Sequence, residues 1–108
     1  MPDRRVALVT GADTGIGHAI ARRLQREGFA LGFATRGRSD AERRSFESLA
    51  EGPGEWVSGD LADPEVPERL VDEVEQALGR LDVLVNNAGI MVRAPMLAVP
   101  ADECRRMF

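Results

Sequence analysis

Residues 6–17 read VALVTGADTGIG, and this stretch decides the fold of the chain. The apolar run Val6–Val9 predicts a buried strand, and the glycines behind it let the main chain turn tightly and pass close to a ligand. A helix that begins at such a turn points its first N–H groups at the turn, where they bind phosphate. The stretch therefore predicts a strand, a phosphate-binding turn and a helix. A turn of small residues with a purely structural role is the alternative.

Apolar runs and helical patterns alternate along the rest of the chain, which is typical of parallel βαβ units. We expect strands at about residues 5–10, 29–35, 56–57 and 81–85. The predicted fold class is α/β, with a doubly wound parallel sheet. Residues 101–108 have the pattern of the opening of a further helix.

Three helices are predicted between these strands. Ser39 and Glu42 form a capping-box pattern at the start of the second helix, and Asp63 followed by Pro64 predicts an N-cap and a first-turn proline for the third. Glycines end the first and third helices, at Gly28 and Gly79. The apolar faces are, in order, Ile16, Ala19, Ile20 and Leu24; Phe46, Leu49 and Ala50; and Val66, Leu70, Val74 and Leu78.

The composition is that of one small globular domain. Of 108 residues, 44% are hydrophobic and 30% are charged, and the net charge is −4. Arginines are interleaved with acids, so we expect no nucleic-acid partner, and no apolar stretch reaches membrane-spanning length. Cys104 stands alone, and the first residues lack the pattern of a signal peptide. We therefore expect a cytoplasmic protein.

Two further motifs follow predicted strands. Asp60-Leu61 comes after the third apolar run, and Asn86-Asn87-Ala88-Gly89 comes after Leu81–Val85. Together with the Thr-Gly-x-x-x-Gly-Ile-Gly spacing of residues 10–17, their order and separation resemble the N-terminal part of the short-chain dehydrogenase/reductase family.

The resemblance implies a Rossmann fold with strand order 3-2-1-4, in which a dinucleotide cofactor lies across the carboxyl ends of the strands. Asp60 is then expected to accept a hydrogen bond from the adenine amino group, with the Leu61 backbone beside it, although an Asx-turn residue would have the same sequence. The cofactor-binding residues implied are Gly11, Thr14, Gly15, Ile16, Gly17, Arg36, Asp60, Leu61, Asn87, Ala88 and Gly89.

The end of the second strand predicts the form of the cofactor. An acidic residue at this position hydrogen-bonds the adenosine ribose and repels a 2′-phosphate, but this chain has Thr35 followed by Arg36, with Arg38 close behind. A guanidinium group suits a phosphate dianion, so NADP is expected and NAD is less favoured. Solvated turn arginines are the alternative, and the charge of Asp13 in the phosphate-binding turn weakens the case slightly.

For three further residues, His18, Trp56 and Cys104, we expect a surface or packing role. His18 lacks a histidine or cysteine partner for a metal ion, so we expect a solvated surface role and no metal site. Trp56 is expected to pack against its neighbours. Cys104 is expected to be a packing residue on a helix.

The residues that carry out the chemistry of the family are missing from this sequence. The resemblance implies an asparagine, a serine and a tyrosine four residues before a lysine, yet these 108 residues contain no tyrosine and no lysine. The absent lysine also excludes a kinase-like phosphate loop. Residues 1–108 are thus expected to be the N-terminal part of an NAD(P)-binding domain, without the catalytic and substrate-binding part, and inactive alone.

The sequence is compatible with two functions. The first is the cofactor-binding part of an oxidoreductase that reduces a carbonyl or oxidises an alcohol, 3-oxoacyl reduction among the options, and that as a full-length protein forms a homo-oligomer. The second is a non-catalytic nucleotide-binding fragment.

Overall fold

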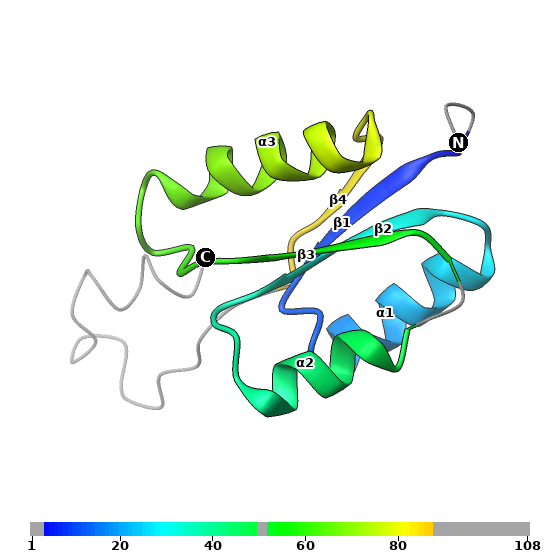
Figure 1. Ribbon diagram of the computed structural model, residues 1–108, viewed down its shortest axis with the longest axis horizontal. Helices are drawn as coiled ribbons and strands as arrows, with labels where there is room; N and C mark the ends of the chain where they lie inside the picture. The colour runs from blue at the N-terminus through cyan, green and yellow to red at the C-terminus, as the bar shows by residue number, and fades with distance from the viewer. Residues whose placement is uncertain (1–3, 50–51, 88–108) are drawn as a thin grey trace, which may run out of the picture.

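The computed structural model describes residues 4–49 and 52–87, and its strands and helices alternate as the sequence predicts (Figure 1). Ala50, Ala88, Gly89, Cys104 and the predicted helix at 101–108 lie outside the described residues. The elements are β1 (Val6–Thr10), α1 (Gly15–Arg26), β2 (Ala30–Thr35), α2 (Asp40–Glu47), β3 (Gly54–Ser58), α3 (Val66–Leu78) and β4 (Val83–Val85).

The described strands form one parallel sheet in the order β3-β2-β1-β4, which confirms the predicted topology. Helices α1 and α2 cover one face of the sheet, and α3 covers the other (Figure 1). This is the arrangement that right-handed crossovers produce on both sides of the first strand. The carboxyl ends of the described strands therefore all lie at the same end of the sheet, which we call the carboxyl edge.

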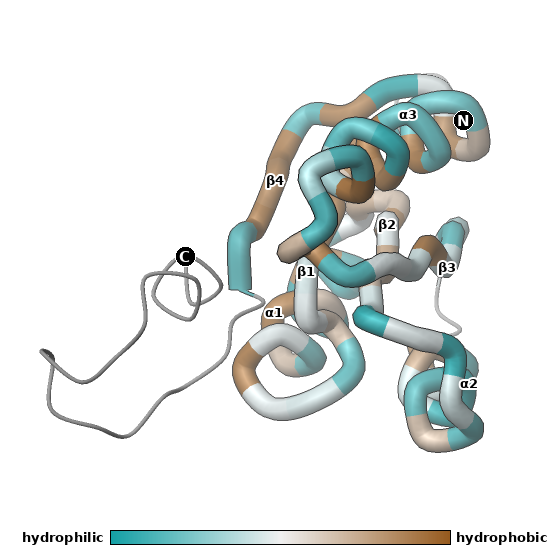
Figure 2. The backbone as a smooth tube through the Cα atoms, turned by 90° about the vertical axis from the view of Figure 1, so that its left-hand side faces the viewer, coloured by the Kyte–Doolittle hydropathy of each residue, from teal (hydrophilic) through white to brown (hydrophobic). Residues whose placement is uncertain are grey.

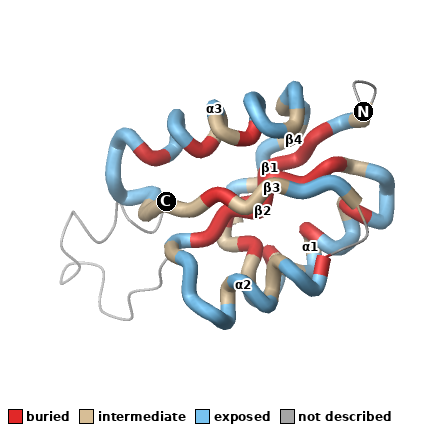
Figure 3. Tube along the Cα trace, viewed as in Figure 1, coloured by how far each residue is buried: buried red, intermediate tan, exposed pale blue. Residues whose placement is uncertain are grey.

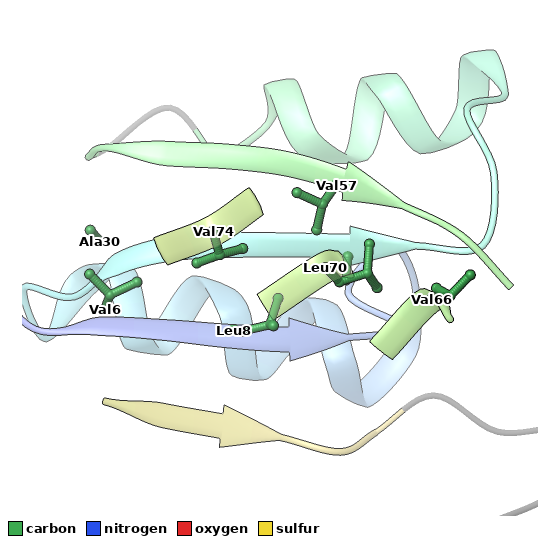
Figure 4. Close-up of a cluster of buried hydrophobic side chains, with 8 residues drawn as sticks. Val6, Leu8, Ala30, Val57, Val66, Leu70 and Val74 are labelled. Carbon is green, nitrogen blue, oxygen red and sulfur yellow. The ribbon is translucent and has the colours of Figure 1, made fainter. Parts of the chain in front are cut away.

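The core lies in two layers, one on each face of the sheet. Leu31 and Phe33 of β2 face α1 and α2, whereas Ala30 and Ala34 of the same strand face α3. Strands β1 and β2 are buried along their whole length (Figure 3). Their side chains alternate between two covered faces, which explains why both strands are apolar almost throughout. The α3 layer joins Val66, Leu70 and Val74 to Val6, Leu8, Ala30, Ala34 and Val57 (Figure 4).

Helix α1 differs from the prediction in the face that it buries. Ile16 was expected in the apolar face but is 73% exposed, and the buried residues are Gly17, Ala21 and Gln25. Small residues at positions 17 and 21 let the helix approach the sheet closely. That approach turns Ile16 outward, beside the glycine-rich turn.

The start of α3 was also predicted too early. Asp63 and Pro64 form a turn ahead of the helix, because the Asp63 carboxylate accepts from the backbone N–H of Glu65 at 3.1 Å and the Asp63 carbonyl accepts from Val66 N at 3.1 Å. Glu65 is the N-cap, and Pro67 lies in the first turn. An aspartate that bonds two residues ahead of itself forms an Asx turn in place of a helix cap.

Strand β4 is shorter than expected and forms an edge of the described sheet (Figure 2). Val83 and Val85 are half-buried, while Leu84 is 49% exposed. Among the described helices, none is both long and apolar enough to cross a membrane.

Candidate functional site

The glycine-rich turn connects β1 to α1 at the carboxyl edge of the sheet. Gly11 and Gly15 have positive φ angles of 61° and 58°, a region that residues with a Cβ rarely adopt. A Cβ added at Gly15 would meet no protein atom within 4 Å, so this position borders open space. The turn therefore depends on glycine for its backbone conformation at two of the predicted cofactor-binding positions.

The N-terminus of α1 lacks a side-chain cap. Thr14 occupies the N-cap position but its side chain makes no capping hydrogen bond, whereas α2 has a complete capping box between Ser39 and Glu42. The N–H groups in the first turn of a helix need acceptors, and a bound anion can supply them. The exposed residues Thr14, Gly15 and Ile16 hence border the point where a phosphate group would sit.

Gly17 packs the turn against the end of β4. A Cβ at this position would lie 2.1 Å from the Gly11 carbonyl oxygen and 2.4 Å from Asn87 Nδ2. Asn87 Nδ2 donates to the same Gly11 carbonyl at 3.2 Å, and the Asn87 backbone N–H donates to the Thr10 hydroxyl at 3.0 Å. The predicted residues Gly11, Gly17 and Asn87 are thus in mutual contact. Of the remaining predicted residues in this motif, Ala88 and Gly89 are not among the described ones.

Thr35 ends β2 with its side chain turned into the protein. Its residue is 3% exposed, and its hydroxyl donates to the Gly37 carbonyl at 2.6 Å while accepting from Trp56 Nε1 at 2.8 Å. The side chain faces the layer that holds α1 and α2. The single proton of the Thr35 hydroxyl is therefore donated within the chain, and the oxygen accepts from Trp56.

Arg36 and Asp60 face each other across the ends of β2 and β3. The Arg36 Nη2 atom lies 3.4 Å from Asp60 Oδ2, and 68% of the arginine side chain is exposed. Asp60 Oδ1 also accepts from the Ala62 backbone N–H at 2.9 Å, which is the Asx-turn geometry kept open as an alternative. Leu61 follows with a partly exposed side chain. A contact this exposed contributes only about 0–1 kcal/mol and is easily exchanged for a ligand.

Arg38 is held by contacts with β3, whereas one interpretation of the sequence made it a solvated turn residue. Its guanidinium carbon lies 4.4 Å from the centre of the Trp56 ring, and the group donates to Trp56 O at 2.8 Å and to Ser58 Oγ at 3.0 Å. Cation–π contact and two hydrogen bonds fix it on β3. Of the two predicted arginines, Arg36 is the one directed toward Asp60.

His18 corrects another expectation, because it is half-buried and joins two helices. Its Nε2 atom lies 3.3 Å from Ser45 O and 3.1 Å from Ser48 Oγ, both at the C-terminal part of α2. Sequence reasoning had no signal for this contact, since the two partners are distant in the chain. Within residues 4–49 and 52–87, no group of three or more His, Cys, Asp or Glu side chains is placed to hold a metal ion.

Two carboxyl groups near the elements of the site have lowered pKa values. Hydrogen bonds from the Ser39 side chain and then from the Ser39 backbone lower the pKa of Glu42, with Gly37 N–H as a smaller contributor. The hydrogen bond from Arg80, followed by that from Val6 N–H, lowers the pKa of Asp82. Both effects favour the ionised form, and neither group belongs to the glycine-rich turn.

The family of short chain dehydrogenases matches residues 5–108 of this sequence. The chain belongs to this family. It is 41% identical over 107 residues to a 1-deoxy-11-beta-hydroxypentalenate dehydrogenase of Streptomyces exfoliatus and 37% identical over 105 residues to a meso-2,3-butanediol dehydrogenase of Serratia marcescens. These matches cover 96% and 97% of this chain, but only 39% and 41% of the two relatives.

Solved structures of short-chain dehydrogenases agree with the fold. An actinorhodin polyketide ketoreductase variant with NADPH superposes with a TM-score of 0.86 at 34% identity, covering 99% of this chain and 41% of that one. A 3-oxoacyl-[acyl-carrier protein] reductase from Brucella melitensis in complex with NAD gives a TM-score of 0.80 at 36% identity, covering 99% and 43%. The chain thus spans about two fifths of the length of the proteins that it matches.

Proposed function

We propose that this chain is the N-terminal, cofactor-binding part of a short-chain oxidoreductase that uses NADP in preference to NAD. Membership of the family and the dinucleotides in the similar solved structures support a nicotinamide cofactor. The whole protein would reduce a carbonyl or oxidise an alcohol, with 3-oxoacyl groups among the candidate substrates, and would assemble as a homo-oligomer. When bound, the reduced nucleotide would supply hydride to a carbonyl, and the oxidised nucleotide would accept hydride from an alcohol.

Each predicted residue has a role in this proposal. The uncapped N-terminus of α1, at Gly15 and Ile16, would hold the pyrophosphate through backbone N–H groups, with Thr14 beside it. Asp60 and the Leu61 backbone would meet the adenine. Asn87 would line the adenosine ribose together with the small residues Ala88 and Gly89, while Gly11 and Gly17 would let the backbone pass close to the cofactor.

The observation that carries the preference for NADP is the position of Arg36. It follows a strand that ends in a neutral, buried threonine, and it reaches across to Asp60 with most of its side chain exposed. A 2′-phosphate would find a guanidinium group and no acidic residue at the end of β2. A charge-assisted hydrogen bond of this kind contributes about 1.5–3 kcal/mol, or roughly ten- to a hundredfold in affinity.

Titration of the 108-residue chain with NADPH and NADH tests the proposal, with Arg36→Gln as the variant and Arg43→Gln as its matched control. Arg43 belongs to α2, where it pairs with Asp40 at 2.9 Å. We expect wild type and Arg43→Gln to bind NADPH at least about tenfold more tightly than NADH. Arg36→Gln should lose most of that difference. Equal wild-type affinities would contradict the assignment of NADP, and binding of neither nucleotide would contradict a cofactor-binding role.

The second candidate function, a nucleotide-binding chain without catalysis, is favoured by the absence of tyrosine and lysine from these 108 residues. Proton transfer to a carbonyl needs a donor within hydrogen-bond reach of its oxygen. An NADPH-oxidation assay of the 108-residue chain with assorted ketones should therefore give no turnover above a buffer control. Turnover would show that this sequence contains its own proton donor.

A further inference from the structure

The side chain of Thr35 connects three segments of the site through one hydroxyl group. It donates to the Gly37 carbonyl at 2.6 Å, which shapes the turn after β2, and it accepts from Trp56 Nε1 at 2.8 Å, which ties that turn to β3. A hydroxyl has a single proton to donate, and here Gly37 receives it. Thr35 cannot then donate to a ribose hydroxyl, so its contribution to a ligand at this edge must be indirect.

Trp56 organises the same turn from the other side. Its ring stacks on Phe46 of α2 with centroids 5.8 Å apart. Arg38 lies over the ring at 4.4 Å and donates to the Trp56 carbonyl at 2.8 Å. The turn of residues 36–38 is thus held at both ends, through Thr35 at its start and through Arg38 at its end.

Arg36 lies between Thr35 and Arg38, and the contacts of these two residues determine where its side chain points. With Thr35 turned inward and Arg38 bound to β3, the backbone presents the Arg36 side chain outward, 3.4 Å from Asp60. The indole N–H is used entirely for this arrangement, since Thr35 is its acceptor. None of these contacts involves the glycine-rich turn.

We propose that Trp56 is a positioning residue for cofactor discrimination. Its indole N–H bonds Thr35 and thereby fixes the turn that presents Arg36 to the 2′-phosphate. The proposal rests on the proposed function and assigns a residue to the preference for NADP that itself touches no cofactor. It also makes the Thr35 hydroxyl necessary for phosphate recognition, although that hydroxyl is buried.

The test uses two adenine nucleotides that differ in their phosphate groups. Adenosine 2′,5′-bisphosphate and adenosine 5′-diphosphate are titrated calorimetrically against the 108-residue chain, and circular dichroism verifies the fold of each variant. Trp56→Phe keeps an aromatic ring but removes the N–H, and Thr35→Val keeps the shape but removes the hydroxyl. Thr35→Ser keeps the hydroxyl and removes only the methyl group. Phe46→Leu is the matched control, because it removes the stacking partner of Trp56 without removing a hydrogen bond.

We expect Trp56→Phe, which loses one hydrogen bond, to weaken binding of the 2′,5′-bisphosphate by about three- to tenfold, and Thr35→Val, which loses two, to weaken it at least as much. Binding of the 5′-diphosphate should change less than about twofold, and Thr35→Ser and Phe46→Leu should keep the wild-type ratio of the two affinities. Limited trypsin digestion gives a readout without nucleotide. Cleavage after Arg36 and Arg38, relative to cleavage after Arg43, should accelerate in Trp56→Phe and Thr35→Val.

Two results would overturn the proposal, and they differ in what else they overturn. If the ratio of affinities depends on Arg36 but is unchanged in Trp56→Phe and Thr35→Val, Trp56 has no positioning role and the proposed function stands. If the wild-type chain binds both nucleotides equally, the preference for NADP fails together with the role of Trp56 in it.

Discussion

Gly17 leaves no room for a side chain at the point where the glycine-rich turn meets β4. Gly15, two residues earlier, has open space around it but a positive φ angle. The same motif thus requires glycine for two different physical reasons, one of packing and one of backbone conformation. Substitutions at the two positions separate these reasons.

We expect Gly17→Ala to lower the free energy of unfolding by about 1–3 kcal/mol, as overpacking does, because its Cβ would collide with Gly11 O and Asn87 Nδ2. Gly15→Ala should cost about 1–2 kcal/mol from the positive φ alone. Urea denaturation followed by circular dichroism measures both. A Gly17→Ala variant as stable as wild type would show that the turn and β4 separate without cost.

Asp60 has two oxygens with different partners, and its substitution tests the adenine contact. Asp60→Ala should weaken NADH binding by about three- to tenfold, as expected for one lost hydrogen bond, and should leave the far-ultraviolet circular dichroism unchanged. NADH is the informative ligand because it lacks the 2′-phosphate that Arg36 would contact. Asp63→Ala, in the neighbouring turn, is the control. Unchanged NADH affinity would return Asp60 to an Asx-turn role only.

Helix α2 is stabilised at its start by side chains and at its end by contacts with α1. Ser39 and Glu42 exchange hydrogen bonds at 3.2 Å and 2.9 Å, while Ser48 and the Ser45 carbonyl meet His18. The sequence predicts the first of these devices, since a capping box is a local pattern. The sequence contains no local pattern that predicts the contacts of Ser45 and Ser48 with His18.

The capping box gives α2 a pH dependence with a defined sign. Because hydrogen bonds lower the pKa of Glu42 in the folded chain, ionised Glu42 stabilises the fold above its unfolded pKa, and this contribution is lost as pH falls through the lower folded value. At pH 7 we expect Ser39→Ala to cost about 1 kcal/mol. Glu42→Gln should also be less stable than wild type at pH 7, and the difference should shrink as the pH falls below the unfolded pKa of about 4.3 and through the lower folded pKa.

Urea denaturation of wild type and Glu42→Gln at several pH values measures this difference. Glu47→Gln is a suitable control, because Glu47 lies on the same helix but outside the capping box. A difference between wild type and Glu42→Gln that persists unchanged at pH 3 would mean that the ionisation of Glu42 does not stabilise α2.

Most of the elements could be predicted from the sequence, because their signals are local. Strand β1 is a continuous apolar run, and Gly79 ends α3 in the left-handed conformation that favours glycine. Predictions were wrong where one sequence pattern is compatible with two local structures. Asp63 was predicted to cap a helix, but it forms an Asx turn. Ile16 fits an apolar helical face by spacing, but the helix buries Gly17, Ala21 and Gln25 and leaves Ile16 exposed.

The candidate site was predictable in its motifs but not in the arrangement between them. Arg36 and Arg38 look equivalent in the sequence, and only the position of Trp56 on the neighbouring strand separates their roles. The link of His18 to α2 likewise depends on how two helices cross. Side-chain partners from different elements carry no pattern in a single sequence.

At the scale of the whole molecule, the sheet has unequal edges. Strands β1 and β2 are covered on both faces, while β4 pairs with β1 on one side and has no described strand on its other side (Figure 2). Val83 and Val85 are half-buried, and Leu84 is the exposed apolar side chain of this strand. Exposed edge strands with apolar side chains favour association with another chain.

We expect the 108-residue chain alone to be marginally stable and to associate at micromolar concentrations through β4. Leu84→Lys should reduce the associated fraction several-fold, since a lysine on an edge strand opposes edge-to-edge pairing. Light scattering across a concentration series measures association, and thermal melting measures stability. Leu61→Lys, at an exposed apolar residue away from β4, is the control. A monodisperse wild-type chain with a cooperative melt would contradict this prediction.

The hydrogen bond from Asn87 to Gly11 joins residues 76 positions apart in the chain. Contacts of such long sequence separation form late, because the entropy of closing the intervening loop must be overcome before they stabilise anything. The first strand, turn and helix can therefore assemble before the turn acquires its final partner. Nucleotide binding then reports the last stage of folding, when β4 has docked beside β1, and the appearance of affinity during refolding should lag behind the appearance of helix.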